Sequence, residues 1–307
     1  MKAFQLSQLG ATPTVVELPT PAPSAPGEIL VTVVAAGLNP VDTLLSLAAN
    51  DRGPHPRVLG LEGVVSHQDR AYYIERAMLP NGTLAEWTIV RASELIALPD
   101  DLDPTSAVPL GIAGLAGWVP VETTVALQKG ETIVVLGATG AVGQAAVQAA
   151  RHLGAGRVVA VGRNEALLKR LLTRGADAYV VLDGVNDAAA IKEATQGGSD
   201  VVFDAIYGEP FAAALRSAKD GSRTVTVGGM AGGLAPLPSR SLIGKTFHGY
   251  SNMTAPSAVK AKAFQTMAKL TASGEFVIEH EVVSFDDIDA QWQRQLDGPG
   301  IKLVVAL

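Results

Sequence analysis

Hydrophobic and polar positions follow two different patterns along the chain. Up to about residue 100 the apolar residues come in short runs, such as Val31–Val34, and residues 84–90 alternate apolar and polar side chains as a half-buried strand does. These runs predict short β segments. Five prolines between Pro13 and Pro26 predict an extended surface loop there, without a regular element.

From Glu131 onward, short apolar runs alternate with helical stretches. The predicted strands are Ile133–Leu136, Val158–Val161, Tyr179–Leu182, Val201–Phe203 and Thr224–Val227, and the predicted helices are 141–153, 165–174, 187–196 and 210–218. Each strand is apolar at consecutive positions, as parallel strands buried on both faces are. The alternation predicts an α/β fold with a doubly wound parallel sheet.

After about residue 245 this alternation fades. A helix is expected at 257–273, followed by the segments Phe276–Val283 and Ile288–Leu296 and a terminal strand at Lys302–Leu307. We expect these segments to complete the first domain. The expected domains are therefore 1–115, which is mainly β, 116–245, which holds the parallel sheet, and 246–307, which returns to the first.

Composition narrows the classes of function. Of the 307 residues 48% are hydrophobic and 18% are charged, which indicates a folded chain with a large core. The absence of cysteine excludes disulfides, thiol nucleophiles and thiolate metal sites. A formal net charge of −6 argues against nucleic acid as a partner. With no signal-peptide pattern and no long apolar run, we expect a cytoplasmic protein without a membrane partner.

The most specific motif is a glycine-rich turn between a predicted strand and a predicted helix. Residues 137–143 read Gly-Ala-Thr-Gly-Ala-Val-Gly, with Ala138, Gly140 and Gly143 at the three glycine positions of a dinucleotide-binding fingerprint. The second position lets a pyrophosphate approach the backbone, and the third lets helix and strand pack closely. We expect cofactor contacts from Ala138, Thr139, Gly140, Val142 and Gly143.

The end of the next strand indicates which dinucleotide is bound. NAD sites usually place an acid about 20 residues downstream, on the ribose hydroxyls. Here Gly162 stands at that place, followed by Arg163 and Asn164, with Lys169 on the next helix. A guanidinium would hold the extra phosphate of NADPH, which an acid would repel. We therefore expect Gly162, Arg163, Asn164 and Lys169 to bind NADPH.

With these motifs in place, the sequence resembles the medium-chain dehydrogenase/reductase superfamily, in its zinc-independent quinone oxidoreductase (zeta-crystallin-like) branch. The segments that carry the resemblance are 35–42, 58–63, 82–87, 137–143, 200–204 and 300–305, in the family's order. The resemblance implies a GroES-like catalytic domain built from both chain ends around a central Rossmann domain. This implication agrees with the domain limits expected above.

The resemblance also bears on metal binding. In the zinc-dependent members a cysteine and a histidine hold the catalytic zinc, and here Asn39 and Leu61 stand at those positions. The five histidines show no paired ligand spacing. We expect no metal site.

Without a metal, the implied reaction is hydride transfer from a nicotinamide to an activated carbon of an enone or quinone. The developing negative charge on the carbonyl oxygen needs a hydrogen-bond donor. Asn39 is the first candidate, either for this carbonyl or for the amide group of the nicotinamide, although an Asn before Pro can simply close a turn. Asp42 can orient a neighbour or cap a helix starting at Thr43. The family's Tyr is replaced by Leu44, which leaves water, Tyr72 or Tyr73 as the proton source.

Two further features come from the resemblance. Gly228, Gly229 and Met230 follow a strand and are expected near the nicotinamide ribose, unless they form a plain glycine loop. Residues 246–250 correspond to an edge strand that pairs between subunits in related proteins. We therefore expect a homodimer.

Three functions stay open from the sequence. The first is an NADPH-dependent, zinc-independent reductase of small apolar quinones or α,β-unsaturated carbonyls. The second is an enoyl-thioester reductase, for which a basic cleft mouth would be needed. The first domain supplies Arg52, Arg57, Arg70, Arg76 and Arg91. The third is an NADPH-binding regulatory or crystallin-like protein with little catalysis, which the replacement of the family's Tyr by Leu44 favours.

Overall fold

The computed structural model describes residues 1–47 and 53–307. These residues divide into two compact units: unit 1 consists of Met1–Ile112 and Phe264–Leu307, and unit 2 of Ala113–Ala263. The sequence predicts divisions after residues 115 and 245. In the structure the second division falls later, inside helix α8 (Ser257–Ala272).

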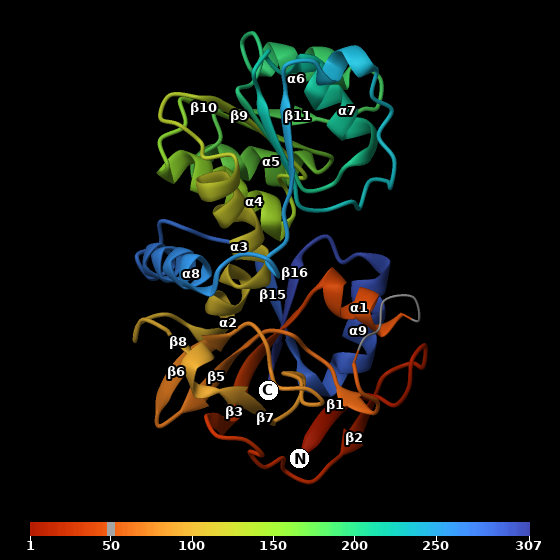
Figure 1. Cartoon of the computed structure of the whole chain (residues 1–307), viewed down its shortest axis with the longest axis vertical. Coiled ribbons are helices and arrows are strands. Elements are labelled where there is room, and N and C mark those ends of the chain that lie inside the picture. The colour runs from red at the N-terminus through yellow and green to blue at the C-terminus, as the bar shows by residue number, and fades with distance from the viewer. Residues whose placement is uncertain (48–52) are drawn as a thin grey trace. The chain divides into compact units, whose positions relative to one another are not determined.

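Unit 2 is built around a six-stranded parallel sheet in the order β11-β10-β9-β12-β13-β14. Figure 1 labels its strands β9, β10 and β11. In chain order the strands are β9 (Thr132–Leu136), β10 (Arg157–Gly162), β11 (Ala178–Val181), β12 (Val201–Asp204), β13 (Arg223–Thr226) and β14 (Thr246–Gly249). The helices between them are α4 (Ala141–His152), α5 (Glu165–Leu171), α6 (Asp187–Ala194) and α7 (Gly208–Ser217), and α3 (Ile112–Val119) leads into the unit. The order reverses between β9 and β12, as in Rossmann sheets, so the predicted fold class is confirmed.

The two faces of this sheet are buried by different helices. Ile133 and Val135 pack in one cluster with residues of α4 and α5, whereas Val134 and Leu136 pack in another with residues of α6 and α7. Burial on both faces explains the continuous apolar runs in the sequence.

The sequence predicts that the segment 246–249 returns with the first domain, but in the structure it forms β14, the sixth strand of this sheet. The alternation of strands and helices in the sequence did not reveal this sixth strand, because the chain between β13 and β14 contains only a short 3-10 turn (Ser239–Leu242) and no α-helix.

Unit 1 contains a seven-stranded sheet with the strand order β15-β16-β3-β5-β6-β8, in which β7 also pairs with β3, and a three-stranded sheet β2-β1-β4. The strands of these sheets are β1 (Lys2–Leu6), β2 (Thr14–Glu17), β3 (Glu28–Leu38), β4 (Arg57–Val58), β5 (Gly63–His67), β6 (Arg70–Ile74), β7 (Trp87–Arg91), β8 (Ile96–Ala97), β15 (His280–Ser284) and β16 (Lys302–Ala306). The helices are α1 (Pro40–Ser46), α2 (Pro104–Ala107) and α9 (Ile288–Asp297).

Both chain ends contribute to the core of unit 1. β16 pairs antiparallel with β3, so that Leu303 lies opposite Leu38. Phe4 of β1 and Trp292 of α9 meet edge to face, with ring centroids 5.6 Å apart. This GroES-like, mainly β unit is therefore built from two separate parts of the chain.

Two local predictions are wrong. The proline-rich stretch contains a strand, β2, which tolerates flanking prolines because it is the edge of its sheet and pairs only with β1. Conversely, the predicted strand 84–90 begins only at Trp87. Leu84 instead accepts a backbone hydrogen bond from Phe4, and Ala85 forms an isolated bridge with Ala3.

Among the described residues, no single helix is long and apolar enough to cross a membrane, although the consecutive helical segments Pro104–Leu110 and Ile112–Thr124 meet that length and composition criterion as a bent pair.

Candidate functional site

The glycine-rich turn leaves β9 with Gly137 in the left-handed region, at a φ of +73°. The Ala138 N–H then donates to the Val161 carbonyl of β10, and the side-chain amide of Gln144 donates to the Thr139 carbonyl. Helix α4 starts after Gly140, and no side chain caps it. Its first backbone N–H groups carry the partial positive charge of a helix N-terminus, which suits an anion.

Gly140 and Gly143, the two later glycines of the turn, differ in whether a side chain would fit at their positions. A Cβ at Gly143 would lie 2.2 Å from the Gly137 carbonyl oxygen and 2.6 Å from the Ala138 Cα, so only glycine fits between α4 and the end of β9. A Cβ at the exposed Gly140 would meet nothing closer than 3.6 Å. Packing within the protein thus explains Gly143 but not Gly140, whose bare backbone leaves room for a phosphate group.

The four residues predicted at the end of β10 have different surroundings. Gly162 is buried, and a Cβ there would lie 3.2 Å from Thr139. Asn164 caps α5, because its Oδ1 accepts the Leu167 N–H. Lys169 forms an ion pair with Glu165 at 3.1 Å. Arg163 is exposed, and its guanidinium has no partner among the residues that the structure describes. Arg163 is therefore the one of the four whose charge is open to a ligand.

The loop after β13 is packed against neighbouring backbone at its first residue and is open at the next two residues. A Cβ at Gly228 would lie 2.4 Å from the Ala205 carbonyl oxygen, while one at Gly229 would meet nothing within 4 Å. Met230 is 75% exposed. Gly228 is thus required by packing, and Gly229 and Met230 present an open surface.

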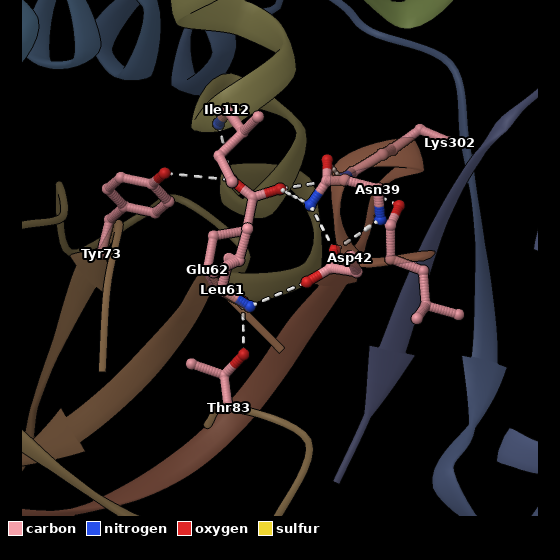
Figure 2. A network of polar contacts seen from close by, with 9 residues as sticks. Asn39, Asp42, Leu61, Glu62, Tyr73, Thr83, Ile112 and Lys302 are labelled. Carbon is pink, nitrogen blue, oxygen red and sulfur yellow. Dashed lines mark hydrogen bonds and ion pairs between the residues drawn. The ribbon is translucent and has the colours of Figure 1, made fainter. Parts of the chain in front are cut away.

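In unit 1 the predicted residues Asn39, Asp42 and Tyr73 join one buried polar network, drawn in Figure 2. Asn39 is the N-cap of α1, and its backbone N–H donates to Asp42 Oδ2 at 2.9 Å. The helix begins at Pro40 and not at Thr43, since proline favours the first helical position. Asp42 thus lies in the first turn of α1 and closes a capping box with Asn39.

Each polar atom of the Asn39 side chain is engaged within this network. The Asn39 Nδ2 donates to Asp42 Oδ2 at 3.2 Å and to Glu62 Oε1 at 3.0 Å, and its Oδ1 accepts from Lys302. Both amide hydrogens therefore face carboxylates. The sequence leaves open whether this amide binds a ligand or Asn39 simply closes a turn, and in the structure the amide holds Asp42, Glu62 and Lys302 together.

Glu62 is the centre of the network and is fully buried. Its Oε1 lies 2.7 Å from Lys302 Nζ, and its Oε2 accepts from the Tyr73 hydroxyl at 3.0 Å and from the Ile112 N–H at 2.6 Å. Lys302 also donates to the carbonyl of Leu38. The network joins the end of β3, the start of α1, Glu62 directly before β5, and residues of β6 and β16 around a buried ion pair (Figure 2).

Burial raises the pKa of two members of the network. It raises the pKa of Asp42 to about 6, against the opposing effects of Lys302 and of the hydrogen bonds from Asn39. It also raises the pKa of Tyr73 well above the ordinary tyrosine value, and the negative charge of Glu62 adds to this shift. The Tyr73 hydroxyl is thus a poor acid held against Glu62, while the other candidate, Tyr72, is half-buried on the same strand.

Two glycines make room for this network. A Cβ at Gly37 would lie 2.5 Å from Glu62 Oε1, and one at Gly111 would lie 2.2 Å from the Tyr73 hydroxyl oxygen. The backbone therefore lies so close to the carboxylate and to the Tyr73 hydroxyl that neither position has space for a side chain.

Sequence reasoning missed Glu62 and Lys302. Both lie in segments that carried the family resemblance, but neither had a local signal of pairing, since 240 residues separate them. The one available sign was the presence of each charged residue within an otherwise apolar run.

The surroundings of these side chains also bear on metal binding. In the described part of the chain, no three His, Cys, Asp or Glu side chains are grouped so that they could hold a metal ion. The carboxylates of the network face the ammonium of Lys302 and the amide of Asn39.

The ion pair gives a stability prediction. Lys302→Met leaves the buried Glu62 carboxylate without its cation. The free energy of unfolding, measured by urea denaturation, should fall by about 3–5 kcal/mol. Glu62→Gln combined with Lys302→Met should recover more than half of that loss. Lys2→Met, which removes an exposed lysine paired with Asp286 at 3.1 Å, is the matched control and should change stability little. Equal losses in Lys302→Met and Lys2→Met would contradict the role given to the pair.

Comparison with known proteins supports the sequence resemblance. Residues 141–273 match the family described as zinc-binding dehydrogenase. The quinone oxidoreductase-like protein 2 of Rattus norvegicus is 26% identical over 245 residues, which cover 75% of this chain and 69% of the rat protein. A mycocerosic acid synthase-like polyketide synthase of Mycobacterium tuberculosis is 29% identical over 217 residues, which cover 67% of this chain but 10% of that protein.

A solved structure matches over the full length. The quinone oxidoreductase of Thermus thermophilus, which was also solved as a complex with NADPH, superposes with a TM-score of 0.85 at 29% identity and full coverage of both chains. With the Rossmann strand order, the two-part mainly β unit and these relatives together, the chain belongs to the medium-chain dehydrogenase/reductase superfamily, in its zinc-independent quinone oxidoreductase branch.

Proposed function

We propose that this protein is an NADPH-dependent, zinc-independent reductase that transfers hydride to a quinone or an α,β-unsaturated carbonyl compound. The observation that carries the proposal is the turn at 137–143. There a glycine is sterically required at 143, while Gly140 and the uncapped start of α4 stay open to a phosphate group. The T. thermophilus relative, whose structure was solved with NADPH, supports the choice of coenzyme.

NADPH supplies the hydride when it is bound. The protein's own part begins with the N–H groups at the start of α4, which would hold the pyrophosphate. The free guanidinium of Arg163 would pair with the 2′-phosphate, with Asn164 and Lys169 as predicted neighbours on the same surface. Gly229 and Met230 offer an open edge after β13 for the nicotinamide ribose.

The residues predicted as catalytic would act indirectly, by fixing the position of the start of α1. Asn39, Asp42 and Tyr73 are hydrogen-bonded to one another or to Glu62, so they fix the start of α1 and keep it dry. Apolar side chains are exposed on that helix and directly after it, with Leu44 49% and Leu47 48% exposed, whereas Asp42, Thr43 and Ser46 of the helix are buried. This reversed polarity supports a small apolar acceptor, with water delivering the proton to the product.

A second candidate is an enoyl-thioester reductase, which the polyketide synthase relatives favour. The basic residues predicted for a thioester arm are only partly suited to it. Arg57 is buried and donates to the Leu45 carbonyl, and Arg52 lies outside the described residues. We therefore rank this activity second.

A panel of acceptors tests the proposed function. We expect NADPH oxidation with a simple enone or a benzoquinone to exceed that with crotonyl-CoA, because the exposed face of α1 is apolar and carries no charge for a thioester arm. The absorbance of NADPH reports the rate. Faster turnover of crotonyl-CoA would favour the thioester reaction, and NADPH binding without oxidation of any acceptor would favour a regulatory protein.

The assignment of the coenzyme gives a second test. Arg163→Ala should raise the Michaelis constant for NADPH about tenfold and leave that for NADH unchanged, because only NADPH carries the phosphate that the guanidinium binds. The control is Arg216→Ala, which removes an exposed arginine on α7 and keeps the net charge equal in the two variants. An unchanged Michaelis constant in Arg163→Ala, or an equal rise in both variants, would refute the assignment.

We also propose that the protein is a homodimer. β14 is an edge strand of the parallel sheet, and Ile243 and Phe247 near it are 70% and 40% exposed. An exposed edge of this kind offers unpaired backbone groups to a second copy. Light scattering should give twice the 31.7 kDa of one chain, and a mass near 31.7 kDa would contradict the dimer.

A further inference from the structure

A buried carboxylate at the end of β12 has no role in the site described so far. Asp204 is the last residue of that strand and pairs in register with Leu136 of β9 and Thr226 of β13. The strand order of the sheet reverses between β9 and β12. Ligands of open α/β sheets bind beyond the carboxyl ends of the strands at such a point.

The side chain of Asp204 is completely buried and accepts hydrogen bonds from the backbone. Its Oδ1 accepts the N–H of Ile206 at 3.0 Å and that of Tyr207 at 2.8 Å. Its Oδ2 is buried and makes no hydrogen bond within the described structure. Asp204 therefore fixes the turn 205–208 that follows it.

This turn has a backbone conformation that needs such support. Tyr207 has a φ of +60° and a ψ of −160°, which residues with a side chain rarely adopt. The Tyr207 N–H is held by Asp204, and its ring stacks on Phe211 with centroids 5.0 Å apart. Strained residues of this kind persist only where the surroundings impose them.

The turn lies in contact with both segments proposed to hold the coenzyme. A Cβ at Gly137 would lie 2.7 Å from Ile206 Cγ2, so the Ile206 side chain rests directly on the glycine-rich turn. On the other side, the Ala231 N–H donates to the Ile206 carbonyl at 2.7 Å. Ile206 thus spaces residues 137–143 from the loop 228–231.

We propose that Asp204 is a positioning residue for the coenzyme. By fixing the turn 205–208 it places Ile206, and Ile206 sets the separation between the glycine-rich turn and the loop 228–231. The inference rests on the proposed function, since those two segments are the ones proposed to hold NADPH.

The test compares two aspartates at opposite ends of the same strand. Asp200 directly precedes β12, accepts the Thr132 N–H at 2.9 Å and forms an ion pair with Lys219. The NADPH dissociation constant is measured by fluorescence titration of the full chain, together with the thermal midpoint. We expect Asp204→Ala to raise the dissociation constant at least tenfold. Asp200→Ala should leave it within twofold, although its thermal midpoint falls.

A conservative variant separates position from charge. Asp204→Asn keeps an oxygen that can accept both backbone N–H groups, so it should restore NADPH binding to within threefold of the unsubstituted protein. The Michaelis constant for the acceptor should stay unchanged in each variant that folds. Should Asp204→Ala fail to fold, Ile206→Ala, which leaves the Asp204 hydrogen bonds intact, should raise the dissociation constant at least threefold.

Normal NADPH binding in Asp204→Ala would overturn the inference, and so would an equal loss of NADPH affinity in Asp200→Ala. If Asp204→Ala does not fold, normal NADPH binding in Ile206→Ala would overturn it. Failure of the unsubstituted protein to bind NADPH is a different result. It would refute the proposed function itself, and the inference with it.

Discussion

The contact between the first turn of α4 and the end of β9 leaves no space for a side chain at position 143. A Cβ there would lie 2.2 Å from the Gly137 carbonyl oxygen, so the helix can approach the strand only through glycine. That approach directs the uncapped start of α4 and the bare backbone of Gly140 toward the carboxyl edge of the sheet. The proposed coenzyme site depends on this constraint, because the phosphate-binding groups are backbone groups that only the approach sets in place.

Unit 1 depends on a different interaction, a single buried ion pair. Desolvating Glu62 and Lys302 is unfavourable, and the structure offsets that cost with donors from Asn39, Tyr73 and the Ile112 backbone. Because Lys302 comes from β16 and Glu62 precedes β5, the pair can form only when both ends of the chain have joined the same sheet. The hydrogen bonds around Asn39 can therefore form completely only when the C-terminal strand β16 has joined unit 1.

The sequence predicted the features that depend on local pattern. The strands β9 to β13 and the glycines at 137–143 followed from apolar periodicity and from the spacing of one motif. It could not predict β14, whose place depends on pairing with β13 after a long irregular segment. Nor could it predict that Asn39 would be enclosed by Glu62 and Lys302, since that depends on a contact between residues 240 positions apart. The contacts of Asp204 with the backbone of the turn 205–208 could not be predicted either, because no sequence motif marks such hydrogen bonds.

Transfer of deuterium from coenzyme to acceptor is the most direct test of the central claim, which is that this chain catalyses hydride transfer from NADPH without a metal. NADPH carrying deuterium in place of both hydrogens on the hydride-donating carbon of the nicotinamide would be incubated with the protein and an enone, with a chelator present throughout. The account predicts a reduced product that carries deuterium at the carbon β to the carbonyl group. A product without deuterium, or activity that is lost with the chelator and restored by zinc, would contradict it.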